Sequence, residues 1–304
     1  MSRVADTASH STLLNNLNRS IERARDIQVQ VSTGKVGQDY AAIGRDSKRL
    51  VSLEAERSRA DHFIGTNQVV DLRLQRMESV VAQVTELASE VRTFLVNAGH
   101  FENAQELDVQ GRMEGFLQTL SGLLNSEQNG RTLFSGGATD TPPVDLDQLP
   151  ADGEFLDTAD LLYYDGDSQV LNHRVSDTLS VNYGATAADP AFENLIRGLK
   201  IAETVDTSDP EATRQRLDRA MELVNGALDG LPDVRGRIGS SRSILEQESN
   251  RMKDFTLALD QSVGDLENID FAEAISRLGE EQAQLQASMA ALSRLRQVTL
   301  TNFL

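Results

Sequence analysis

The chain has 304 residues, no cysteine and no tryptophan, and its 29 basic and 47 acidic residues give a formal net charge of -18. Without cysteine, a disulfide framework, a thiolate metal site and a cysteine nucleophile are excluded. The acidic balance argues against nucleic acid and anionic membrane surfaces as partners. The first 20 residues lack an apolar core and no long apolar run follows, so we expect neither a cleavable signal peptide nor a transmembrane span.

The first predicted helix begins near the N-terminus and carries apolar residues at alternating steps of three and four. Such spacing keeps one narrow row on one side of a helix. The row consists of Leu14, Leu17, Ile21, Ala24, Gln28 and Val31. We expect this helix to end near Ser32-Thr33-Gly34, and Gly37 and Gly44 to mark a loop or a short extended segment after it.

A second and longer row predicts a helix over about residues 48–98. Its members are Val70, Leu74, Met77, Val81, Val84, Ala88, Val91, Leu95 and Ala98. At 1.5 Å per residue such a helix is about 75 Å long. A third helix is predicted over about 104–128, ending near Asn129-Gly130.

The C-terminal third repeats the pattern. One row covers 217–231 and stops before Pro232, a second covers 245–269, and a third covers 275–295. All six prolines lie between residues 142 and 232, and a proline inside a helix costs about 3 kcal/mol. The sequence therefore predicts a mainly α fold: an elongated antiparallel helical bundle or coiled coil formed by the N- and C-terminal regions, with a small β-rich domain inserted in the middle.

The predicted insert covers residues 136–189, where glycine and proline pairs mark loops. Leu171, His173 and Val175, and then Leu179, Val181 and Tyr183, alternate with polar neighbours as half-buried strands do. Asp165-Gly166-Asp167 is interpreted as a hairpin turn before the first of them. The expected division is 1–45 with 262–304 as a terminal coiled-coil domain, 46–135 with 190–261 as a helical rod, and 136–189 as the outer β-rich domain.

No catalytic, cofactor-binding or metal-binding constellation is present in the sequence. The four histidines are scattered singly. Ser32-Thr33-Gly34-Lys35 is not a phosphate-binding loop, because Val29 and Val36 occupy positions that require glycine and a hydroxyl residue. The acidic residues near 145 and 165 do not have the spacing of a calcium-binding EF-hand. We expect no enzyme activity, no cofactor and no metal.

Short motifs at both ends resemble a known family. Leu13-Leu14-Asn15-Asn16-Leu17 with Val29–Lys35, and Gln284–Ser288 with Leu300–Leu304, are similar to the terminal helices of flagellin and its hook-associated relatives, the axial proteins of the bacterial flagellum. Gly130–Gly137, Thr139–Pro143, Tyr164–Asp167 and Asp189–Phe192 are more similar to the hook-associated members than to flagellin. The segment Val36–Gly44 departs from the family, because it lacks the two prolines and the acidic pair common there.

This resemblance implies a structural subunit, assembled between hook and filament, with its end helices lining an inner tube. The implied partners are further copies of the same chain, another hook-associated protein, flagellin, the flagellar type III export apparatus and an export chaperone. The implied location is the extracellular flagellum, reached without a cleavable signal peptide. The residues expected at the assembly interface are Leu14, Leu17, Ile21, Leu285, Met289, Leu292 and Leu295. Two alternatives stay open: a divergent flagellin, and a cytoplasmic coiled-coil scaffold or signalling protein.

Overall fold

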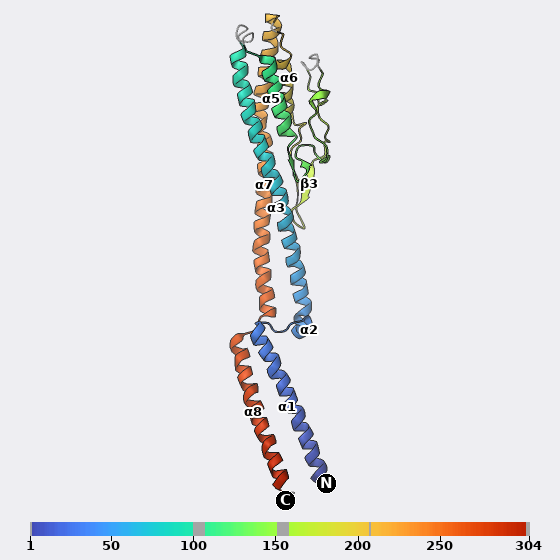
Figure 1. Ribbon diagram of the computed structural model, residues 1–304, viewed down its shortest axis with the longest axis vertical. Helices are drawn as coiled ribbons and strands as arrows, with labels where there is room; N and C mark the ends of the chain where they lie inside the picture. The colour runs from blue at the N-terminus through green and yellow to red at the C-terminus, as the bar shows by residue number, and fades with distance from the viewer. Residues whose placement is uncertain (1, 100–106, 151–157, 207, 302–304) are drawn as a thin grey trace. The chain divides into compact units, whose positions relative to one another are not determined.

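The computed structural model describes residues 2–99, 107–150, 158–206 and 208–301, with the backbone alone for 2–10 and 295–301. Two compact units emerge: residues 60–254, and residues 1–59 together with 255–304. Both consist mainly of long helices, and the only strands in the described residues form two small antiparallel pairs within 60–254. The predicted fold class, mainly α with a small β-rich insert, is confirmed (Figure 1).

The core of the 60–254 unit is formed by the apolar row predicted for the second helix. Helix α3 (Ser47–Ala98) matches the predicted span of about 48–98, and its row from Leu74 to Leu95 is almost fully buried. Helices α5 (Val109–Leu124), α6 (Pro190–Glu203) and α7 (Pro210–Glu267) also contribute buried residues to this core. Repeated apolar positions that face several neighbours at once explain why this unit is well packed.

Helix α7 does not stop at Pro232, so the predicted break there is wrong. The helix continues through the proline to Glu267. Proline removes one backbone hydrogen bond at a cost of about 3 kcal/mol, but its neighbours Leu231 and Val234 are fully buried. Because burial of each such side chain contributes about 1.5–3 kcal/mol, packing outweighs the local propensity for a break.

The third helix is shorter than the sequence suggests, because Asn129-Gly130 is a hairpin turn and not a helix end. Helix α5 ends at Leu124, and strands β1 (Glu127–Gln128) and β2 (Arg131–Thr132) pair antiparallel around the turn. Both turn residues have positive φ, 54° at Asn129 and 72° at Gly130. This is the two-residue turn that Asn-Gly strongly favours. The predicted start near residue 104 lies outside the described residues.

The two strands predicted near 171–183 are present, but the predicted turn before them is wrong. Strands β3 (Leu171–Arg174) and β4 (Ser180–Tyr183) form an antiparallel hairpin. Asp165–Asp167 forms no turn between strands: the Asp165 N–H donates to the carbonyl of Pro143, and the Asp167 N–H to that of Ser135. These backbone bonds tie it to a distant segment, a pairing that local spacing cannot reveal.

Aromatic packing and one buried asparagine fix the insert onto the helices. The rings of Phe134 and Phe192 meet edge to face with centroids 5.7 Å apart, and the buried Tyr163 hydroxyl donates to the Ala187 carbonyl at 2.9 Å. Asn67 on α3 is buried, and its amide bonds both the Val175 carbonyl and the His173 ring. The hairpin is therefore attached to α3 by satisfied polar contacts as well as by apolar ones.

The second unit contains the two chain ends. Helices α1 (Ser2–Thr33) and α8 (Phe271–Thr301) pack against each other, and α1 ends where the sequence predicts. Short helical turns α2 (Tyr40–Ile43) and η1 (Gly44–Asp46) follow α1, where a loop or extended segment is expected. The Asp39 side chain caps α2 by accepting from the Ala42 N–H, which explains the local helical turn.

Candidate assembly interface

The α1–α8 pair is antiparallel and is closed at one end by a backbone clasp. Gly34 takes the left-handed conformation, φ 73°, that glycine adopts readily after a helix. The Ile269 N–H then donates to the Gly34 carbonyl at 3.0 Å, and the Val36 N–H to the Glu267 carbonyl at 2.7 Å. Lys35 adds an ion pair with Glu267 at 2.8 Å. The clasp holds the end of α1 beside the start of α8.

One row of each helix is turned toward its partner. Along both helices, the less exposed positions recur at steps of three and four, as in a coiled coil. On α1 they are Leu13, Leu17, Ser20, Ala24, Ile27 and Val31, and on α8 they are Ala274, Leu278, Glu281, Leu285, Ser288 and Leu292. We call these two sets the contact rows.

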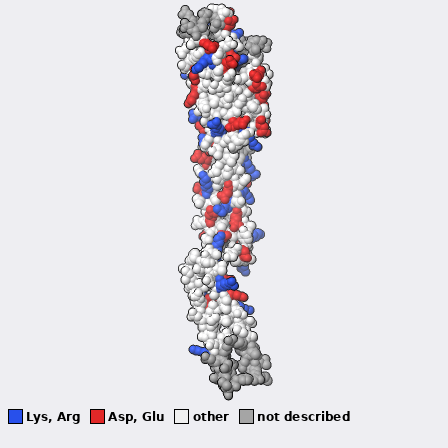
Figure 2. Space-filling view, in the orientation of Figure 1, with Lys and Arg blue, Asp and Glu red and all other residues white. Residues whose placement is uncertain are grey.

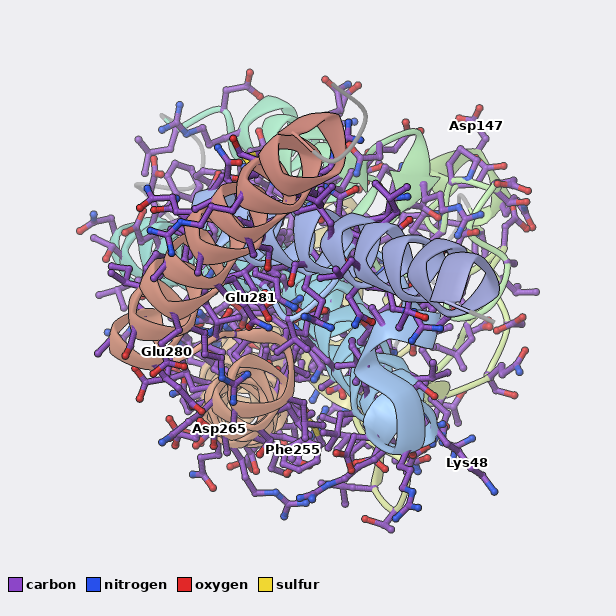
Figure 3. The ribbon with its side chains drawn as sticks, turned by 90° about the horizontal axis from the view of Figure 1, so that it is seen from below. Lys48, Asp147, Phe255, Asp265, Glu280 and Glu281 are labelled. Atoms are coloured by element: carbon purple, nitrogen blue, oxygen red, sulfur yellow. The ribbon has the colours of Figure 1, made fainter. Side chains whose placement is uncertain are left out.

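A polar cluster that joins Arg23 to Ser20 and Glu281 of the contact rows marks the register of the pair. The Arg23 Nε lies 2.7 Å from Glu281 Oε1, and Arg23 also donates to the Ser20 hydroxyl at 2.9 Å. The hydrogen bond raises the pKa of Arg23 and lowers the pKa of Glu281. Figure 3 shows Glu281 on the side of α8 that faces α1, with Glu280 on its outer side. An exposed pair of this kind contributes little stability, but it places residue 23 opposite 281.

A second apolar row on each helix is left open to solvent. Next to the contact rows, Leu14 and Ile21 on α1 are 37% and 44% exposed, and on α8 Phe271, Ile275 and Met289 are 53%, 57% and 56% exposed. Residues 14 and 21, and likewise 275 and 289, are multiples of seven apart, so each set follows one side of its helix. We call these residues the open rows.

Two segments of the pair carry no charge on any side. Residues 11–18 of α1 and 282–293 of α8 contain no Asp, Glu, Lys or Arg. A helix that faces water normally carries charged residues on its outer face. Figure 2 shows charged side chains of both signs on the described surface with uncharged stretches between them. Leu14 and Met289 of the open rows lie within these two uncharged segments.

The seven residues predicted for assembly fall into three groups. Leu17 and Leu285 are half-buried and Leu292 is buried, all in the contact rows, whereas Leu14, Ile21 and Met289 belong to the open rows. The side chain of Leu295 lies outside the described residues. The sequence row missed Phe271, which follows the clasp and is 53% exposed; an aromatic residue at a helix start beside an apolar row is the signal that could have identified it.

The described residues contain neither a candidate metal site nor a candidate membrane span. In the parts of the chain with described side chains, no three acidic or histidine side chains gather closely enough to hold a metal ion. None of the helices described here combines the length and apolar character that crossing a membrane requires. The feature of the α1–α8 pair that the geometry defines is its exposed apolar surface, formed by the open rows.

Comparison with known proteins identifies the class. Residues 4–139 match the bacterial flagellin N-terminal helical region, and residues 221–304 match the bacterial flagellin C-terminal helical region. These matches cover most of the chain, which belongs to the flagellin family, the structural proteins of the bacterial flagellum.

Particular relatives carry the hook-associated name. The chain is 23% identical over 288 residues to flagellar hook-associated protein 3 of Escherichia coli K12, covering 89% of this chain and 90% of that protein. The fold resembles that of flagellar hook-associated protein 3 from Legionella pneumophila (TM-score 0.57, 13% identity, 71% of this chain and 98% of that one). It also resembles FlgL of Bacillus cereus (TM-score 0.54, 17% identity, 70% and 98%).

Proposed function

We propose that this protein is the subunit that joins the flagellar hook to the filament. The observation that carries the proposal is the pair of open rows on α1 and α8, because apolar rows at both chain ends, beside charge-free segments, are suited to contact neighbouring chains. The relatives named hook-associated protein 3 favour this position in the flagellum over that of a filament subunit. In this role the chain has no catalytic step, cofactor or metal.

The open rows provide a physical driving force for assembly. Fully burying a leucine, isoleucine, methionine or phenylalanine contributes about 1.5–3 kcal/mol, so covering the five open-row residues, each roughly half exposed, contributes several kcal/mol per subunit. Rows on one copy that pack on a different surface of the next produce a helical or ring-like array without two-fold symmetry. Self-association is thus the first contact that the proposal requires.

The other proposed partners follow from position in the flagellum. Another hook-associated protein lies on one side and flagellin on the other, and the export apparatus with a chaperone delivers the chain without a cleavable signal peptide. Within this proposal, residues 1–45 with 262–304 form the inner tube, 46–135 with 190–261 the rod, and 136–189 the outer domain. The pairing of α1 with α8 is compatible with the cytoplasmic scaffold alternative, but the match to the flagellin family favours the flagellar role.

The test introduces a carboxylate into an open row. Met289→Asp is compared in cells with Ser276→Asp, which adds the same charge to an exposed position of α8 outside both rows. We expect Met289→Asp cells to secrete flagellin into the medium without building filaments, and Ser276→Asp cells to swim normally. Normal filaments on Met289→Asp cells would contradict the proposed interface.

Position distinguishes a junction subunit from a filament subunit. Immunogold labelling of the epitope-tagged chain on intact cells should mark one site between hook and filament. Labelling along the whole filament would instead identify a flagellin, and labelling only in the cytoplasm would identify a scaffold.

A further inference from the structure

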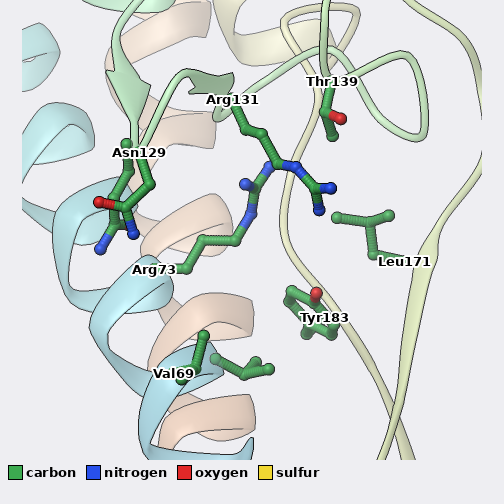
Figure 4. Close-up of a pocket in the computed structure, with 9 residues that line it drawn as sticks. Val69, Arg73, Asn129, Arg131, Thr139, Leu171 and Tyr183 are labelled. Atoms are coloured by element: carbon green, nitrogen blue, oxygen red, sulfur yellow. The ribbon is translucent and has the colours of Figure 1, made fainter.

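A pocket of about 330 Å³ lies within the 60–254 unit, where three elements converge (Figure 4). Helix α3 supplies Val69, Val70 and Arg73, and the β1–β2 hairpin supplies the residues around its turn. The third wall is the open end of the β3–β4 hairpin, where Leu171 and Tyr183 are register partners. Two sequence-distant hairpins and a helix thus form one concave site.

The positive side of the pocket is formed by two guanidinium groups. Arg73 Nη2 donates to the Thr132 carbonyl at 2.8 Å, which holds its side chain under the hairpin, while its Nε is buried without a hydrogen-bond partner. Arg131 is exposed beside it, and Figure 4 shows the two side chains extending toward each other. Within the described residues, no carboxylate forms an ion pair with either arginine, and none lines the pocket.

The electrostatics of the pocket are unusual for this chain. Burial lowers the pKa of Arg73; of its two neighbours in the pocket, Tyr183 raises this pKa and the positive charge of Arg131 lowers it. The protein has 47 acidic residues against 29 basic ones, yet the described pocket lining contains no acidic residue. Two adjacent arginines that lack an acidic neighbour repel each other. A ligand with negative charge relieves that repulsion.

The opposite side of the pocket is largely apolar. Val69 is 65% exposed although it is a branched aliphatic residue next to buried Val70, and Leu171 and the Tyr183 ring continue the same surface. Thr139 and Asn129 add hydrogen-bonding groups near the rim. Pockets with an apolar lining and a few converging polar groups are typical ligand sites.

Backbone geometry fixes these groups before any ligand arrives. Arg131 stands directly after the Asn129-Gly130 turn and pairs with Gln128 in the β1–β2 register. Leu171 and Tyr183 are held by the β3–β4 register, which the buried Asn67 attaches to α3. A site set by two hairpin registers needs little reordering on binding, which lowers the entropic cost of association.

We propose that this pocket binds an organic carboxylate, with the carboxylate between Arg73 and Arg131 and the attached apolar stem against Val69, Leu171 and Tyr183. Arginine suits this task because its planar group donates two parallel hydrogen bonds to a carboxylate. The same chemistry is offered by a free small acid and by a glutamate side chain of another protein chain. The site is separate from the open rows, so it does not depend on the proposed assembly role.

The experiment uses the full-length protein and isovalerate, a carboxylate with a branched apolar stem. Binding is followed by the backbone amide shifts of residues 129–131, 139, 171 and 183 in ¹⁵N-labelled protein. Isovaleramide tests the stem without the charge, and sulfate at equal ionic strength tests the charge without the stem. We expect saturable shifts with isovalerate and weaker binding of both controls.

The matched variants are Arg131→Gln and Arg76→Gln. Each removes one positive charge from an exposed arginine, but Arg76 lies outside the pocket. Because a charge-assisted hydrogen bond is lost, Arg131→Gln should weaken isovalerate binding by about tenfold to a hundredfold, and Arg76→Gln should leave it unchanged. No hydrogen bond or ion pair is described for the Arg131 side chain, which is exposed, so its replacement should leave the fold intact, and the amide spectrum checks this directly.

A final arm separates the two sources of the carboxylate. The capped peptide acetyl-Gly-Glu-Gly-amide should displace isovalerate if the pocket binds a glutamate side chain of another protein. It should fail to displace isovalerate if the pocket binds free acids. Both results are consistent with a carboxylate site. Three results would overturn it: no saturable shifts with isovalerate, equal binding by isovaleramide or sulfate, or equal binding by Arg131→Gln and wild type.

Discussion

The two units of this protein use the same heptad spacing with opposite results. In residues 60–254 the row on α3 is buried among α5, α6 and α7, with Leu74, Val81 and Val91 fully buried. In the other unit only five described side chains are buried: Ser20, Leu50, Leu259, Ala274 and Leu292, and of these only Leu50 is fully buried. A heptad row thus shows that a helix has one partner, whereas burial on its further sides shows whether additional partners belong to the same chain.

The strongest test of this comparison is a charge in the buried row. Val81→Asp places a carboxylate at a fully buried position and should cost several kcal/mol, comparable with the whole stability of a domain. We expect loss of the cooperative unfolding transition or aggregation. Leu72→Asp, at a 54% exposed position of the same helix, is the matched control and should change the melting temperature little.

The same change in the contact row should have a smaller and local effect. Leu285 is half-buried on α8, so Leu285→Asp should destabilise the α1–α8 pair by about 2 kcal/mol and leave residues 60–254 folded. Limited proteolysis should trim wild-type ends to about residues 45 and 265, and trim the variant faster, since few buried contacts protect this pair. If the protease cut both chain ends as slowly as residues 60–254, the proposed difference in packing between the two units would be contradicted.

Acid should loosen the pair through Glu281. Its pKa is lowered by the hydrogen bond from Arg23, so its stabilising contribution is present above the unfolded value, about 4.3, and is lost as pH falls through the lower folded value. Because an exposed pair contributes little stability, far-UV circular dichroism melting between about pH 6 and 3 should show a small loss for wild type and a smaller one for Glu281→Gln. Glu280→Gln, on the outer side of α8, should keep the wild-type dependence.

The smallest expected effect is that of calcium. Binding to the folded form would raise stability by about 2.7 kcal/mol at a hundredfold excess over the dissociation constant. The acidic side chains Asp145 and Asp165 both accept from Gln148, an arrangement that is satisfied within the protein. We expect no melting shift with calcium. A shift abolished by Asp165→Ala would show that the acidic loop is a metal site.

The sequence was sufficient for the span of α3 and the end of α1, but not for the continuity of α7 or for the faces of the helices. The span of α3, the end of α1 and the β3–β4 strands follow from periodicity and glycine placement. On α1, however, Leu13 and Leu14 are both apolar, and each begins a possible row with seven-residue repeats. Which of the two rows faces inward depends on contact with α8, and the local sequence of α1 holds no information about that contact. The predicted assembly residues are for that reason divided between contact and open rows.

Other differences arise where a distant contact outweighs a local preference. Pro232 lies inside α7 because its neighbours are buried, and Asp165–Asp167 bonds backbone groups of residues 135 and 143. Asn129-Gly130 carried a local signal for a hairpin, but the apolar pattern before it favoured a longer helix. The pocket between two hairpins and α3 could not be predicted, because Arg73 and Arg131 are brought together only by the tertiary fold.

The buried phenol of Tyr163 has an optical consequence. With no tryptophan in the chain, tyrosine dominates the near-ultraviolet signal, and three of the four tyrosines, including fully buried Tyr163, belong to residues 60–254. The fourth, Tyr40, is 50% exposed. Near-ultraviolet dichroism therefore follows the packing of one unit almost alone. Opening of the α1–α8 pair changes only the helical signal in the far ultraviolet, so a single unlabelled sample distinguishes the two events by wavelength.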